Sequence, residues 1–171
     1  MPRDRSAAAP VSKAGAPQNE YAWDMGLQDF LQQHAGVVPD KPPSATIAAW
    51  KAAVSALAAR FKEVLAPIEQ LKLTDWAVLR EYRGVRYNAD ALTIEFGENL
   101  ITLEPDAIYP EAAILGRASL NCGVRLVHLD CGEDGQLWRY HWVVPHDAAV
   151  AELTRDAIEL LVEALIKPSV G

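Results

Sequence analysis

The stretch that decides the fold is VRLVHLDCGEDGQLWRYHWVV (residues 124–144), which reads as two strands joined by a tight turn. Asp134-Gly135 is a strong signal for a two-residue type I′ turn, because both residues tolerate a positive φ. Such a turn places Glu133 opposite Gln136, and the rest of the register follows from it. One face then pairs Cys131 with Trp138, Leu129 with Tyr140 and Val127 with Trp142, and the other pairs Asp130 with Arg139, His128 with His141 and Leu126 with Val143. The opposite charges in one of these pairs support the register, and the aromatic face is expected to face the core.

Further strands are predicted on the N-terminal side of this hairpin. In ALTIEFGENLITLEP (residues 91–105), pairing Phe96 with Ile101 and Ile94 with Leu103 gathers the large apolar residues on one face. Pro105 is expected to end the second of these strands. Residues 114–120 (ILGRASL) read as a strand, whereas residues 74–83 fit either a short helix or a strand, with a strand favoured from residue 78.

Three helices are predicted around the strands. Apolar residues at helical spacing indicate helices over residues 20–35, 47–68 and 148–166. For the second helix we expect Ser44 as the N-cap and an end or bend at Pro67. For the third helix we expect Asp147 as the cap. Helices grouped at the ends of a run of strands are typical of the α+β class. We therefore expect two N-terminal helices, an antiparallel meander of about five strands, and a C-terminal helix packed on one face.

Length and charge limit the classes of protein to consider. The chain has 171 residues and 18.7 kDa, which fits one domain over residues 20–171 behind an Ala/Pro/Ser-rich tail at residues 1–19. The net charge of the whole chain is −7. The tail has a net charge of +2, from Arg3, Arg5 and Lys13 against Asp4, so the remaining residues carry −7 − 2 = −9. Such acidity argues against nucleic-acid backbones and anionic membrane surfaces as partners. The absence of a membrane-length apolar run and the presence of only two cysteines favour a cytoplasmic protein.

The sequence offers one cluster with metal-binding chemistry. The predicted register sets the Cβ atoms of His128 and His141 roughly 5 Å apart, within reach of one metal ion, with Cys122, His146 or Asp130 as a third ligand. Two imidazoles alone do not make a site, so we assign no metal, no cofactor and no catalytic residue. A strand over residues 124–131 also holds Cys122 and Cys131 too far apart for a disulfide.

Three functions remain, and the first is preferred. The chain is expected to be a non-enzymatic protein-binding module with an acidic surface that suits a basic partner, of the adaptor, chaperone or immunity kind. Bacterial secretion chaperones and immunity proteins are similar in size, charge and element order, but no motif identifies a family. The expected interface holds Leu126, His128, His141 and Val143, and the apolar stripe of residues 47–68 is a second surface for a homodimer. The alternatives are a small-molecule pocket lined by Trp50, Trp138, Tyr140 and Trp142, or a metal or enzyme site at the two histidines.

Overall fold

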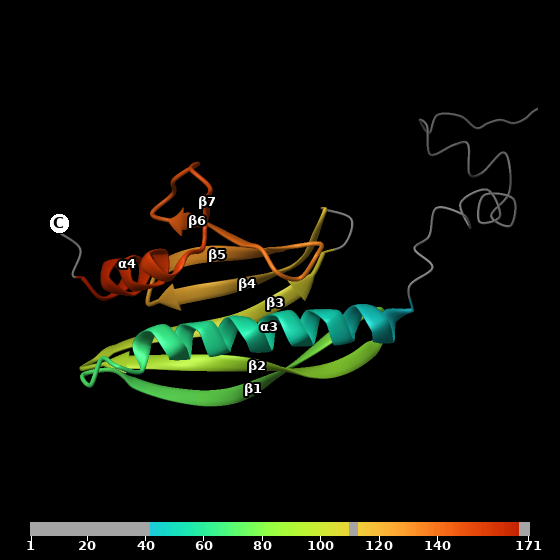
Figure 1. Ribbon diagram of the computed structural model, residues 1–171, viewed down its shortest axis with the longest axis horizontal. Helices are drawn as coiled ribbons and strands as arrows, with labels where there is room; N and C mark the ends of the chain where they lie inside the picture. The colour runs from blue at the N-terminus through green and yellow to red at the C-terminus, as the bar shows by residue number, and fades with distance from the viewer. Residues whose placement is uncertain (1–41, 110–112, 168–171) are drawn as a thin grey trace, which may run out of the picture. The chain divides into compact units, whose positions relative to one another are not determined.

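The computed structural model describes residues 42–109 and 113–167; the helix predicted at residues 20–35 and the tail at residues 1–19 lie outside them. The described chain forms a seven-stranded antiparallel sheet and two helices, so the α+β class is confirmed (Figure 1). The elements are α3 (Pro43–Leu65), β1 (Lys72–Tyr82), β2 (Val85–Phe96), β3 (Asn99–Ile108), β4 (Ile114–Cys122), β5 (Arg125–Gly132), β6 (Trp138–Val144), β7 (Ala151–Glu152) and α4 (Arg155–Ile166).

Strand order in the sheet follows chain order from β1 to β7, as a meander requires. The structure has seven strands where about five were expected. The strand favoured from residue 78 is present as β1 but starts earlier, at Lys72, and residues 151–152 form the unexpected β7. Side chains of both helices and of one face of the sheet share a single buried core. The opposite face of the sheet, called the outer face below, carries half-buried polar side chains on β4 and β5.

Helix α3 buries the predicted apolar stripe but differs at both ends. It begins at Pro43 with Pro42 as N-cap and no capping side chain, because proline suits the first turn of a helix, so the N-cap prediction for Ser44 was wrong. It ends at Leu65, two residues before Pro67, which leaves Ile68 outside the helix and exposed. The buried residues of α3 are Thr46, Ile47, Trp50, Ala53, Val54, Leu57, Ala58, Phe61, Val64 and Leu65. This stripe lies in the chain's own core and is not available for a homodimer.

The C-terminal helix is shorter than predicted. Thr154 caps α4 by accepting the N–H of Ala157, whereas the Asp147 carboxylate accepts the N–H of Ala149 in a local turn outside the helix. The intervening β7 pairs with β6, and the N–H of Leu153 donates to the carbonyl of Trp138. Because pairing with β6 satisfies backbone N–H and C=O groups of residues 151–153, these residues join the sheet instead of extending α4.

The β2–β3 hairpin keeps the predicted face but not the predicted register. Ile94 lies opposite Ile101, a shift of two residues from the predicted pairing, because only Gly97 and Glu98 form the turn and Gly97 takes a φ of +59°. Since a shift of two leaves side-chain direction unchanged, the apolar residues still share one face. Pro105 does not end β3, which continues past a bulge to Ile108.

Candidate functional site

The β5–β6 hairpin forms with the predicted register over most of its length. Five predicted pairs are present, from Cys131–Trp138 to Val127–Trp142, including His128 opposite His141. A bulge then places Leu126 opposite Val144 rather than Val143.

The turn of this hairpin is wider than predicted, so Glu133 and Gln136 do not pair as ladder residues. The N–H of Gly135 donates to the carbonyl of Gly132, and the Asp134 carboxylate accepts the N–H groups of Gln136 and Leu137 at 2.8 and 3.3 Å. Only Gly135 has a positive φ, which excludes a type I′ turn.

The outer face of the sheet holds the predicted histidine pair. The rings of His128 and His141 meet edge to face with centroids 5.3 Å apart. Burial, and then the charges of Arg117 and His141, lower the pKa of His128 and favour its neutral form. Asp130, the predicted partner of Arg139, instead accepts two hydrogen bonds from Arg117 at 2.6 and 3.1 Å. Asp130 and Arg139 are thus cross-strand neighbours as predicted, but the ion pair of Asp130 is with Arg117 of β4.

Among residues 42–109 and 113–167, no group of three or more His, Cys, Asp or Glu side chains is placed to hold a metal ion. Asp130, one of the third ligands considered, has both carboxylate oxygens engaged by Arg117. Cys122 and Cys131 are free thiols.

The four aromatic residues proposed for a pocket do not surround one cavity. Trp50 is completely buried, and its ring centroid lies 5.9 Å from that of Trp138, with the planes tilted by 39°. Trp50 therefore contributes to the core, and Tyr140 and Trp142 are half-buried residues packed against that core. Trp138 alone of the four lines a cavity of about 340 Å³.

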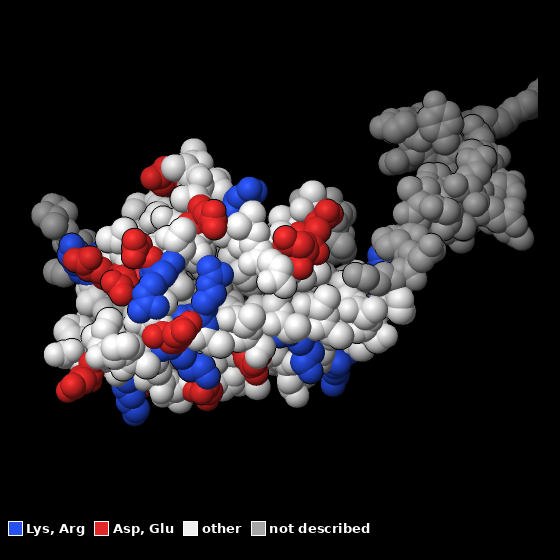
Figure 2. All heavy atoms as spheres, in the orientation of Figure 1, with Lys and Arg blue, Asp and Glu red and all other residues white. Residues whose placement is uncertain are grey.

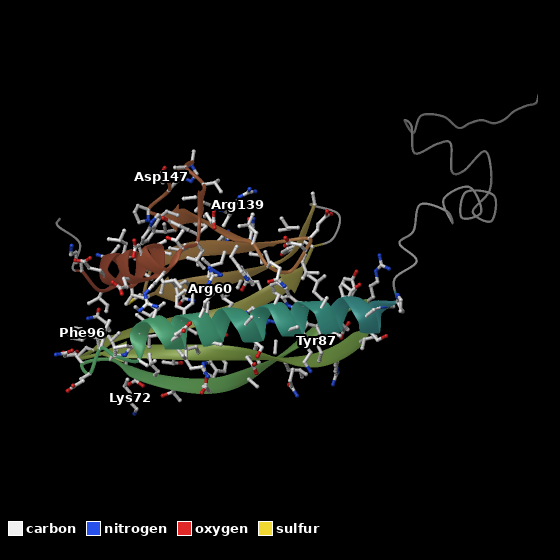
Figure 3. The ribbon with its side chains drawn as sticks, in the orientation of Figure 1. Arg60, Lys72, Tyr87, Phe96, Arg139 and Asp147 are labelled. Atoms are coloured by element: carbon white, nitrogen blue, oxygen red, sulfur yellow. The ribbon has the colours of Figure 1, made fainter. Side chains whose placement is uncertain are left out.

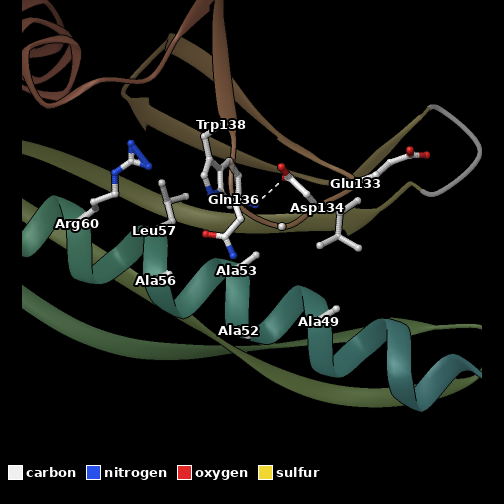
Figure 4. Close-up of a pocket in the computed structure, with 12 residues that line it drawn as sticks. Ala49, Ala52, Ala53, Ala56, Leu57, Arg60, Glu133, Asp134, Gln136 and Trp138 are labelled. Carbon is white, nitrogen blue, oxygen red and sulfur yellow. Dashed lines mark hydrogen bonds between the residues drawn. The ribbon is translucent and has the colours of Figure 1, made fainter.

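This cavity is an open groove between α3 and the loop that joins β5 to β6, and we call it the alanine groove (Figure 4). Its floor is made by small and apolar side chains and its rim by charged and polar ones. The lining residues are Ala49, Ala52, Ala53, Ala56, Leu57, Arg60, Leu115, Glu133, Asp134, Gly135, Gln136 and Trp138. The four alanines follow the i, i+3, i+4, i+7 spacing of one helix face, a signal that is visible in the sequence.

Charge is unevenly placed along the alanine groove. Arg60 stands at one end, where its guanidinium donates a 2.6 Å hydrogen bond to the carbonyl of Leu153, and it projects from α3 toward the chain that precedes α4 (Figure 3). Glu133 and Asp134 stand at the other end. Hydrogen bonds from the N–H groups of Gln136 and Leu137 lower the pKa of Asp134, so this carboxylate is charged at neutral pH.

Elsewhere on the helix side, acidic and basic side chains are interspersed (Figure 2). Two more open hollows, of about 410 and 580 Å³, lie near the end of α4. Ile68 and Phe96 line the first, and Arg125 lines the second while capping α4 through the carbonyls of Ala164 and Leu165.

Neither helix of the described chain has the length and apolar character needed to cross a membrane. Comparison of the chain with protein-family models, with curated proteins and with solved structures finds no match in any of the three.

Proposed function

We propose that the chain is a non-enzymatic protein-binding module that holds a segment of a partner protein in the alanine groove. The observation that carries the proposal is the composition of this groove. Its floor consists mainly of alanine methyl groups beside Trp138, and an acidic rim stands at one end. A floor of small side chains lets another backbone approach closely, and Trp138, which is only 2% exposed, forms a rigid packed base under this floor. An adaptor, a chaperone or an immunity protein would use such a surface.

The partner segment that fits carries an apolar side chain beside a Lys or Arg. The apolar side chain would cover Ala52 and Ala56, which are exposed in the free chain. The Lys or Arg would lie next to Glu133 and Asp134, which are also exposed. Because Asp134 is already held by two backbone N–H groups, a cation meets a carboxylate in a fixed position. Since this rim is solvent-exposed, its contribution should weaken as salt is added.

A long side chain placed on the floor tests the proposal. Ala52→Arg fills the groove, and Ala59→Arg is the matched control, because Ala59 is exposed on the same helix but does not line the groove. The variants and the wild-type chain are used to capture proteins from the native host, and each captured protein is then purified and titrated by calorimetry. We expect at least a tenfold loss of affinity for Ala52→Arg, no loss for the control, and weaker binding for Asp134→Asn. Equal affinity of the two arginine variants for every captured protein would contradict the proposal.

A second candidate function is the binding of a small molecule in the same groove. The volume of about 340 Å³ falls within the range of ligand pockets, and Trp138 supplies an aromatic wall. Saturable quenching of tryptophan fluorescence by an apolar compound would support this reading, provided that Ala52→Arg abolishes it. A flat response across a broad library would count against it and leave the protein-binding proposal untouched.

A further inference from the structure

The outer face of the sheet brings together His128 of β5 and His141 of β6, which we call the histidine pair. The two residues lie opposite each other in the register, and their ring centroids are 5.3 Å apart. Two imidazoles that each direct a nitrogen at one zinc ion, about 2.1 Å away and at a tetrahedral angle, have centroids roughly 5.3 Å apart. The strands therefore already hold the two rings at the separation that a shared metal ion requires.

Both imidazoles are available to bind an ion. In the part of the chain that the structure describes, neither ring makes a hydrogen bond or an ion pair, and both side chains are half-buried. The rings now meet edge to face, and rotation of a ring about its Cβ–Cγ bond, a soft torsion, directs both nitrogens at one point. The pKa of His128 is lowered, first by burial, which favours the neutral form that a metal ion needs as a ligand.

The charges around the histidine pair are compatible with a bound cation. Arg117 donates two hydrogen bonds to the carboxylate of Asp130, and Arg139 lies opposite an acidic residue of β7 in the register. Asp106 accepts a hydrogen bond from the hydroxyl of Ser119 and forms no ion pair within the described residues. Each arginine beside the pair thus has an acidic neighbour, and the Asp106 carboxylate adds a negative charge that favours a cation.

The described residues supply two ligands to such an ion, because no third His, Cys, Asp or Glu side chain of this part of the chain is placed to complete the group. Asp130 is engaged by Arg117, and Cys122 packs against the core, on the other side of the sheet. The remaining positions would be taken by water or by a donor from outside, as open positions are in catalytic zinc sites. Imidazole nitrogen suits Zn²⁺, Cu²⁺ and Ni²⁺, whereas Mg²⁺ takes oxygen ligands.

We propose that the histidine pair chelates one divalent transition-metal ion, and that Cu²⁺ binds more tightly than Zn²⁺. This order of affinity is the general one for nitrogen ligands and the first-row metals. Because β5 and β6 supply one ligand each, the ion joins the two strands, and it binds the folded chain in preference to the unfolded chain. The chelate uses no residue that lines the alanine groove, so it stands or fails independently of the proposed function.

Calorimetric titration of the full chain with ZnCl₂ and with CuCl₂ tests the proposal. All variants carry Cys122→Ser, which removes the half-buried thiol as a competing ligand. We expect one ion per chain, and binding at least tenfold weaker in His128→Gln and in His141→Gln. The matched control is His146→Gln, which replaces an exposed histidine in the turn after β6 and should bind as the parent does. Unchanged affinity in both strand variants, or no binding of either metal by the parent, would overturn the proposal.

Nuclear magnetic resonance locates the ion even if a glutamine variant fails to fold. In the full chain with labelled histidines, Zn²⁺ should shift the imidazole nitrogen signals of His128 and His141 and leave those of His146 unchanged. An equal concentration of Mg²⁺ should shift none of them. Zn²⁺ should also raise the melting temperature of the parent chain and not that of His128→Gln/His141→Gln. Zinc-induced shifts that spare the histidine pair would overturn the proposal.

Discussion

Gly116 is the position where one added methyl group should cost the most. A Cβ built there would lie 2.7 Å from the carbonyl oxygen of Ala107 and 2.7 Å from Cζ3 of Trp50. Both distances are roughly 1 Å inside the optimum for non-bonded atoms. Trp50 is completely buried against Trp138, so its ring has no free space into which it can move.

The magnitude for Gly116→Ala follows from two opposing terms. Overpacking a core costs about 1–3 kcal/mol, and two close contacts with fixed groups point to about 3 kcal/mol. Alanine in a strand regains about 0.5–1 kcal/mol of backbone entropy relative to glycine. We therefore expect the free energy of unfolding to fall by about 2 kcal/mol, measured by urea unfolding followed by circular dichroism.

Two further variants separate this steric explanation from a general effect of alanine in the sheet. Gly132→Ala places its Cβ no closer than 3.4 Å to any atom and should change the free energy of unfolding by less than about 0.5 kcal/mol. Trp50→Phe removes the ring atoms that meet the new methyl group, so the two substitutions should couple by about 1 kcal/mol in a double-mutant cycle. The reasoning is refuted if Gly116→Ala behaves like Gly132→Ala or if the cycle shows no coupling.

Three other predictions concern single side chains. Thr154→Ala should lower the free energy of unfolding by about 1 kcal/mol in urea titrations because the hydroxyl caps α4, whereas Ser44→Ala should change it little because Ser44 is not the N-cap of α3. The pKa of His128 is lowered in the folded chain, so the unfolded chain binds the proton more tightly. The melting temperature of the wild type should therefore fall as the pH drops below about 6.5, the pKa of an unfolded histidine. Thermal melts of His128→Gln over the same pH range should show a smaller fall in melting temperature. Burial raises the pKa of Cys131 to about 12, so a thiol reagent should label Cys122 alone in the folded protein and both cysteines in urea.

Local patterns predicted the parts of the fold that depend on periodicity. The helical spacing around Trp50 and the alternation around Leu129 each identify a buried face, and these faces are buried as expected. Ends and partners were predicted less well, because they depend on residues distant in sequence. Residues 151–153 pair with β6 instead of joining α4, and Asp130 takes Arg117 from β4 instead of Arg139 from β6. A sequence pattern shows which face a side chain occupies, but not which of two neighbouring strands supplies its partner.

The candidate site was harder to predict than the fold. Trp138 lines the alanine groove rather than a pocket shared with Trp50 and Trp142, and the loop carboxylate of Asp134 was interpreted only as part of a turn signal. Its position depends on hydrogen bonds from two N–H groups in a loop wider than the predicted two-residue turn. Within the described residues β1 is an edge strand, and this also escaped prediction, because a strand at the edge of a sheet and one at its centre differ in their neighbours and not in their own periodicity.

The alanine groove leads to a prediction about stoichiometry. The groove is lined by α3, Leu115 of β4 and the β5–β6 loop of a single chain. Each chain should therefore bind one partner segment, and the bound species should weaken in Ala52→Arg and persist in Ala59→Arg. Native mass spectrometry that shows two segments per chain at saturation, or an unchanged bound species in Ala52→Arg, would show that the groove is not the binding surface.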